Sequence, residues 1–243
     1  MAYAGFTLVF LVLVLYAASG PRGTDQFWYL GDTITLLDGE PPLTNTIYPG
    51  PLLRGQVSID EPYFAHHTIV LYLVLPFAKC LGVYAGWLAF NIAAALTVAT
   101  LVAITVHRLA SPSAAVLAYG TFLLLPLIVW QTANVLQELA LCLLTALLAV
   151  LYVFAAQSPL RWILLLAISS VAVLANPLFL AVALALPVLF LIQLRRGLKP
   201  GYVVVALLAL GASLFFQAMK SHWFPSSFQP SLTSVIVNAI PGG

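Results

Sequence analysis

Charged residues are scarce in this chain. Only 7% of its 243 residues are charged and 63% are hydrophobic, and the mean hydropathy is +1.07. In soluble domains about a quarter of the residues are charged, so we expect an all-α integral membrane protein instead of a soluble fold. At about 20 residues for each crossing, the chain has room for roughly seven or eight spans and for no sizeable soluble domain.

Basic tracts and cysteine motifs are also missing. The nine Lys and Arg residues form no run that would indicate nucleic-acid binding. Cys80 and Cys142 lie in apolar runs, without Cys or His neighbours at the spacing of a metal site. The sequence therefore predicts no disulfide framework and no zinc site, and it favours inert packing of both thiols within helices.

Acidic residues are few, and their distribution is uneven. Six of the seven lie in one polar stretch between Gly20 and Tyr63, and these are Asp25, Asp32, Asp38, Glu40, Asp60 and Glu61. The seventh, Glu138, falls at the end of a later apolar run. Because the rest of the chain offers few reactive groups, we expect the chemistry in this polar stretch.

Apolar runs bounded by turn residues predict about seven transmembrane helices in a single domain over residues 1–219. A polar tail follows over residues 220–243. Residues 65–81 are too polar at their ends for a span, so we expect a juxtamembrane or re-entrant element there. The predicted spans are Phe6–Ala18, Val83–Val106, Ala114–Trp130, Leu139–Ala156, Trp162–Ala175, Leu178–Leu194 and Tyr202–Met219.

The basic residues decide the expected orientation, because cytoplasmic loops carry an excess of Lys and Arg. If residues 65–81 do not cross, five basic residues share one side, and these are Arg108, Arg161, Arg195, Arg196 and Lys199. The N-terminus is then inside, and the loop 20–63 and the tail are extracytoplasmic.

The first part of the acidic loop has helical periodicity. Four apolar residues, Phe27, Leu30, Ile34 and Leu37, recur on one face of residues 24–38, and Asp25, Tyr29 and Asp32 fall on the other. This pattern predicts an amphipathic surface helix with its apolar side on the bilayer and both acids toward water or a cavity. An acid such as Asp25 in a first turn also has a purely structural explanation, because the helix dipole favours it.

The second part of the loop is rich in proline and leads to carboxylates beside imidazoles. Asp60 and Glu61 come shortly before His66 and His67. Such a group can bind a divalent cation or a phosphate-bearing headgroup, and simple anchoring at the interface is the alternative. Elsewhere, the five Trp residues are expected at the headgroups, Pro126 at a kink or helix start, and Asn91, Thr97 and Thr100 in hydrogen bonds within the bundle.

In the order of these features the chain resembles the GT-C superfamily of polyprenyl-phosphate-sugar-dependent glycosyltransferases, which includes the aminoarabinose transferase and the protein O-mannosyltransferases. The resemblance covers about residues 5–215. It rests on the segments 23–30, 36–40, 60–63, 71–82, 106–109, 125–126, 137–138 and 174–177. Asn176 departs from the pattern, because the superfamily commonly has Lys there, and the chain stops after about seven predicted spans, where such enzymes usually continue.

The resemblance implies inverting transfer of a sugar from a polyprenyl-phosphate carrier to an acceptor hydroxyl on the extracytoplasmic side. Asp25 would be the general base, and Asp60 or Glu61 would orient the acceptor or hold a divalent cation, Mg²⁺ or Mn²⁺, with Asp25. Cationic donors for the leaving phosphate would come first from Arg54, His66 and His67, with Lys220 and His222 ranked behind them. Asp32 and Glu138 would line the substrate site, in a bacterial inner membrane protein.

Two other functions stay open at this point. A shortened, non-catalytic relative would keep the helix bundle and act as a scaffold among membrane-protein partners. A small-molecule transporter is the third reading, but intramembrane acids and lysines that mark a substrate path are scarce here, and no inverted repeat is evident.

Overall fold

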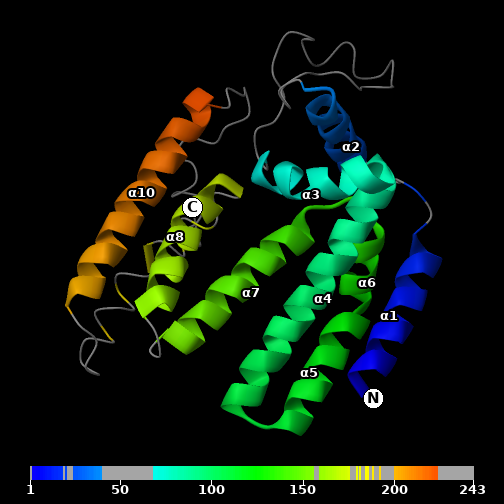
Figure 1. Cartoon of the computed structure of the whole chain (residues 1–243), viewed down its shortest axis with the longest axis horizontal. Helices are drawn as coiled ribbons and strands as arrows, with labels where there is room; N and C mark the ends of the chain where they lie inside the picture. Colours follow the sequence, from blue (N-terminus) through cyan, green and yellow to red (C-terminus); the bar gives the residue numbers. More distant parts are fainter. Residues whose placement is uncertain are drawn as a thin grey trace, which may run out of the picture. The chain divides into compact units, whose positions relative to one another are not determined.

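The computed structural model describes residues 2–18, 20, 24–39, 68–155, 159–175 and 200–223, together with a few isolated positions between 179 and 192. These residues form helices and no strands, which confirms the predicted all-α class. Figure 1 labels them α1 to α8 and α10. The loop 40–67, which holds Arg54, Asp60, Glu61, His66 and His67, lies outside the described residues, as does the tail from residue 224.

The helices follow the predicted apolar runs closely. The described residues give α1 (Ala2–Ala17), α2 (Thr24–Leu37), α3 (Thr68–Leu81), α4 (Val83–Leu109), α5 (Pro112–Leu124), α6 (Pro126–Ala133), α7 (Glu138–Ala155), α8 (Pro159–Ala175) and α10 (Gly201–Trp223). Among them, α4 is long and apolar enough to cross a membrane, and α5 with α6 would make a second such element if the bent pair counts as one span. The described helices therefore do not support seven spans.

The chain divides into two compact units. Unit 1 comprises Met1–Glu40 and Val70–Val153, and unit 2 comprises Pro41–Ile69 and Phe154–Gly243. In unit 2, α8 packs on α10 through small side chains. Ser170 Oγ of α8 lies 3.2 Å from Ala209 O of α10 and 2.8 Å from Leu166 O of its own helix. Small and hydroxyl side chains allow such close helix approach in apolar surroundings.

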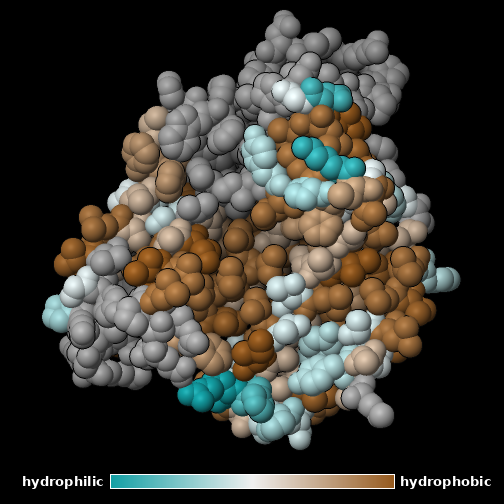
Figure 2. Space-filling view, viewed as in Figure 1, coloured by the Kyte–Doolittle hydropathy of each residue, from teal (hydrophilic) through white to brown (hydrophobic). Residues whose placement is uncertain are grey.

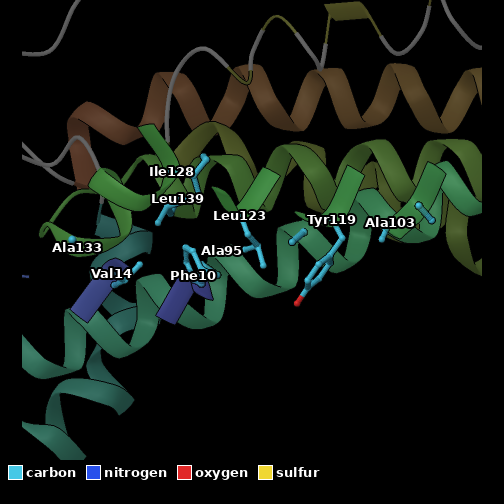
Figure 3. Packing of buried hydrophobic residues seen from close by; sticks show 12 residues of the cluster. Phe10, Val14, Ala95, Ala103, Tyr119, Leu123, Ile128, Ala133 and Leu139 are labelled. Atoms are coloured by element: carbon cyan, nitrogen blue, oxygen red, sulfur yellow. The ribbon is translucent and has the colours of Figure 1, made fainter. Parts of the chain in front are cut away.

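The core of unit 1 is formed by α1, α4, α5, α6 and the start of α7, with α5 packed on α4 and α1 packed on α5 and α6. Figure 3 shows Phe10 and Val14 of α1, Ala95 of α4 and Leu123 of α5 within this cluster. Alanines on α4 leave room for the neighbouring helices, and Gly120 of α5 does the same for α1, since a Cβ there would lie 2.6 Å from the Phe6 ring. Apolar contact over this area is the main stabilising term.

A proline divides the predicted span 114–130. The helix stops at Leu124 and restarts at Pro126, and the two parts are bent by 53°. Proline lacks a backbone N–H and disfavours helical geometry in the residue before it, so it fits the first position of the new helix. The prediction that Pro126 marks a kink or helix start is confirmed.

A glycine separates α3 from α4, and α3 runs across the end of α4 instead of continuing it (Figure 1). Gly82 between them has φ +84°, which a residue with a Cβ rarely adopts. One turn later, a Cβ on Gly86 would lie 2.5 Å from Ala78 Cα, so the two backbones touch. This contact lets α3 fold over the start of α4 and present its apolar face to α2.

Two expectations about single side chains are wrong. Trp87, which was expected at the headgroups, is fully buried beneath α2. Cys80, which was expected to pack within a helix bundle, is exposed on α3, whereas Cys142 is half-buried. In both cases the reason is the crossing of α3 over α4, which covers Trp87 and leaves the outer side of α3 open.

Candidate functional site

One end of unit 1, which we call the polar end, is where four segments meet. They are the backbone of Gly20 after α1, the helix α2, the start of α4 and the turn between α6 and α7. Gly20 N donates to Tyr84 Oη at 3.1 Å there. Figure 2 shows hydrophobic surface over most of the middle of unit 1, with the most hydrophilic surface toward its ends. Asp32, Asp38 and Glu138 belong to the polar end, and Arg108 belongs to the opposite end.

Three buried amides join the elements at the polar end, and we call them the amide chain: Gln26, Asn134 and Asn91. Gln26 Nε2 donates to Asn134 Oδ1 at 2.9 Å, and Asn91 Nδ2 donates to the Asn134 carbonyl at 2.7 Å. The Asn134 amide also donates to Trp130 O at 2.6 Å. The first turn of α2 is thereby fixed to α4 and to the α6–α7 turn.

A second contact fixes the middle of α2. Trp87 Nε1 donates to Thr33 Oγ1 at 2.9 Å, and the Tyr29 ring lies 5.6 Å from the Trp87 ring. Thr33 itself donates to Tyr29 O at 2.6 Å. Because each buried polar atom of this contact has a partner, its burial is not penalised.

The orientation of α2 differs from the prediction, although its extent agrees. The expected apolar face is broken, because Gln26 and Thr33 are buried while Ile34 is 38% exposed. Leu30, Leu36 and Leu37 do pack on the cluster formed with α3. Hydrogen bonds to Asn134 and Trp87 allow the two polar side chains to face inward, which a count of apolar residues cannot show.

Asp32 is half-buried at the polar end. Burial disfavours its charged form and raises the pKa of Asp32 from 3.8 to about 8. At pH 7 the neutral acid then predominates by about ten to one. A protonated carboxyl can donate a hydrogen bond, which a carboxylate cannot.

The raised pKa of Asp32 gives a pH-dependent stability. Between about pH 4 and pH 8 the folded chain keeps a proton that the unfolded chain loses, so stability falls as pH rises, by at most about 1.4 kcal/mol per pH unit. We expect Asp32→Asn to flatten this slope in thermal unfolding measured from pH 5 to pH 8. The exposed Asp38 provides the matched control, Asp38→Asn, which should leave the slope unchanged. An unchanged slope in Asp32→Asn would refute the burial of a protonated Asp32.

Two buried acceptors at the polar end have no hydrogen-bond partner among the described residues. They are Asn91 Oδ1 and Glu138 Oε2. Asn91 is 0% exposed, and Glu138 opens α7, where the helix dipole favours an acid. Buried acceptors without a partner are costly, and both atoms are closed off from the surface by the surrounding helices.

The remaining predicted site residues can be placed only in part. Asp25 is the second residue of α2, next to the anchored Gln26, and its side chain is outside the described residues. Asp25 and Asp32 are seven residues apart, so their Cα atoms share a face of α2 about 10 Å apart along the axis. Among the described residues, no group of three or more His, Cys, Asp or Glu is placed to hold a metal ion.

Sequence reasoning missed most of the residues that build the polar end. Hydrogen bonding of Asn91 within the bundle is confirmed. Thr97 and Thr100 are exposed and donate to Ala93 O and Leu96 O of their own helix, one turn back. Gln26, Asn134 and Thr33 received no role. The signal for Gln26 and Asn134 was the presence of single amides at the ends of apolar runs, which is uncommon in a chain with so little polarity.

Comparison of the chain with models of protein families, with curated proteins and with solved structures gives no match.

Proposed function

We propose that the chain is an integral membrane protein of seven crossings whose polar end faces the extracytoplasmic side. The support is physical. Large apolar side chains are exposed on α1, α5, α8 and α10, among them Tyr16, Leu117, Leu160 and Leu208, and water would not favour so large an apolar surface. By the positive-inside rule Arg108, which lies at the end of α4 opposite the described acids, favours the cytoplasmic side for that end, whereas Lys79 of α3 lies at the polar end.

In this proposal α4 and the bent pair of α5 and α6 cross the bilayer, and α1, α7, α8, α10 and the run 178–194 supply the other crossings. The helices α2 and α3 lie at the extracytoplasmic interface. The crosswise position of α3 on α4 supports an interfacial element, because a helix that continues into the bilayer would extend along α4.

We further propose that the polar end transfers a sugar from a polyprenyl-phosphate carrier to an acceptor hydroxyl, as the resemblance to the GT-C superfamily implies. The observation that carries this step is the amide chain, which holds the first turn of α2 rigidly at the polar end. Asp25 is in that turn. A base must be held within hydrogen-bond reach of the proton that it removes, and rigid anchoring of its helix serves that need.

The reaction proceeds by inversion in this proposal. The acceptor oxygen forms a bond to the anomeric carbon, and the bond between that carbon and the phosphate oxygen breaks with its electron pair on the phosphate. The Asp25 carboxylate takes the proton of the acceptor hydroxyl. The leaving phosphate then needs cationic donors, for which Arg54, His66 and His67 are the candidates.

Asp32 and Glu138 bind substrate in complementary ways in this proposal. Neutral Asp32 donates a hydrogen bond to a sugar or phosphate oxygen. Glu138, in the first turn of α7, accepts a hydrogen bond from a sugar hydroxyl. A divalent cation, Mg²⁺ or Mn²⁺, would be held by the carboxylates of Asp25, Asp60 and Glu61, if transfer requires one.

The direct test is transfer by the purified full chain in proteoliposomes. The donors are polyprenyl-phosphate mannose and polyprenyl-phosphate aminoarabinose with labelled sugars, and a membrane extract supplies acceptors, with and without EDTA. Label that leaves the carrier only when the chain is present supports the proposal. A chain that releases no label from either donor, yet purifies in a stable complex with larger membrane proteins, would establish the scaffold function instead. Isotope uptake into sealed vesicles would identify a transporter.

A further inference from the structure

A cavity of about 520 Å³ lies between α1, α4 and α5 at the end of unit 1 opposite the polar end. Small-molecule sites have volumes of about 300 to 1,000 Å³, so the cavity is of ligand size. Its α4 wall is a stripe at helical spacing formed by Thr100, Ala103, Ile104 and His107.

The other walls are aromatic and aliphatic, from Tyr3 of α1 and from Val116 and Tyr119 of α5. The two tyrosine rings meet edge to face at 5.0 Å, and Tyr119 Oη is hydrogen-bonded to Thr7 Oγ1 at 2.8 Å. The Thr100 hydroxyl donates to Leu96 O at 2.8 Å. Because these hydroxyls are already engaged within the protein, the walls offer mainly apolar surface, which suits a hydrocarbon chain.

One basic residue, His107, lines the cavity. Arg108 follows it in the sequence without lining the cavity, and both residues are exposed in the last turn of α4. The acids of unit 1 with described side chains, Asp32, Asp38 and Glu138, belong to the other end of the helices. No described acid therefore competes for these donors, and an anionic group at the rim would be favoured.

We propose that this cavity binds one hydrocarbon chain of an anionic membrane lipid, whose phosphate is held at the rim by Arg108 and His107. The inference rests on the membrane placement in the proposed function and is independent of sugar transfer. The placement agrees with the chemistry, because in the proposed orientation this end faces the cytoplasmic leaflet, where anionic lipids attract basic residues.

The first test uses the unaltered full chain in detergent, with bound lipid measured by native mass spectrometry. We expect dioleoyl phosphatidylglycerol to bind roughly fivefold or more tightly than dioleoyl phosphatidylcholine, from the charge at the rim. In a series of phosphatidylglycerols, affinity should fall roughly fourfold for each methylene that no longer fills the cavity. Equal binding of dihexanoyl and dioleoyl phosphatidylglycerol, or full competition by glycerol 3-phosphate, would overturn the proposal in favour of a phosphate site without a chain pocket.

Variants separate the chain pocket from the rim. Val116→Trp fills the cavity and should weaken phosphatidylglycerol binding at least tenfold, whereas Leu117→Trp, at a neighbouring position that is 65% exposed and outside the cavity, should not. Arg108→Gln should abolish the preference over phosphatidylcholine and keep the dependence on chain length. Unaltered binding in a folded Val116→Trp protein would refute the pocket. If the chain binds lipid but transfers no sugar, only the proposed transferase activity is refuted. If it transfers sugar but binds no lipid, only the lipid site proposed here is refuted.

Discussion

Asp25→Asn is expected to abolish sugar transfer while α2 stays in place. Asparagine has nearly the same size as aspartate and cannot accept the acceptor's proton, and a positioned base contributes about 10²- to 10⁴-fold to such a step. The loss should appear in the initial rate of label transfer in proteoliposomes. The helix should persist, because Gln26 keeps its hydrogen bond to Asn134 and the dipole interaction lost at a first turn amounts to only about 0.3 to 1 kcal/mol.

The control for this prediction is Asp38→Asn. Asp38 is an exposed acid directly after the same helix, so its substitution changes the net charge equally and should leave the rate within about twofold, as surface changes usually do. Thermal unfolding of both variants checks that the fold is kept. An Asp25→Asn protein with the rate of the unaltered chain would exclude the general-base role.

Gly86→Ala is expected to destabilise unit 1 strongly. The new methyl group would lie 2.5 Å from Ala78 Cα and 2.6 Å from Ala78 N, and backbone atoms cannot rotate away as a flexible side chain can. Overpacking of this kind costs typically about 1 to 3 kcal/mol. Since α3 must then move away from α4, the Trp87 site under α2 should loosen, and transfer should fall with it.

The matched control is Gly211→Ala in α10, where nothing lies within 4 Å of the added methyl group. Alanine is the better helix former by about 1 kcal/mol, so this variant should be as stable as the unaltered chain or slightly more stable. Thermal unfolding in detergent measures both. If Gly86→Ala unfolds at the same temperature as Gly211→Ala, the close crossing of α3 and α4 is wrong.

The helix boundaries were largely predictable because they depend on local chemistry. Proline and glycine act on the backbone within a residue or two, so Gly82 and Pro126 marked real helix ends. The apolar run from Val83 gave α4 almost to its last residue. The number of membrane crossings was harder to predict from the sequence. Apolar runs of similar composition form helices of 8 to 27 residues in the described part of the chain, and the shorter ones cannot cross a bilayer alone.

The polar end was much less predictable, because its contacts join residues that are far apart in the chain. Gln26 and Asn134 are separated by 108 residues, and Trp87 and Thr33 by 54. Periodicity placed Ile34 on the apolar face and gave Thr33 no role. Thr33 is nevertheless buried, because the indole donor of Trp87 satisfies the threonine hydroxyl and so removes the penalty for burying it.

The exposed thiol on α3 makes the sidedness of the chain directly measurable. Cys80 lies on the element that crosses the polar end and Cys142 is half-buried, and these are the two cysteines of the sequence. A maleimide that cannot pass a bilayer will therefore report which compartment the polar end faces: intact cells should label at Cys80 if that end is extracytoplasmic, and Cys80→Ser should remove the label. Inside-out vesicles should give the reverse result, so that the native chain serves as its own topology probe without any added tag.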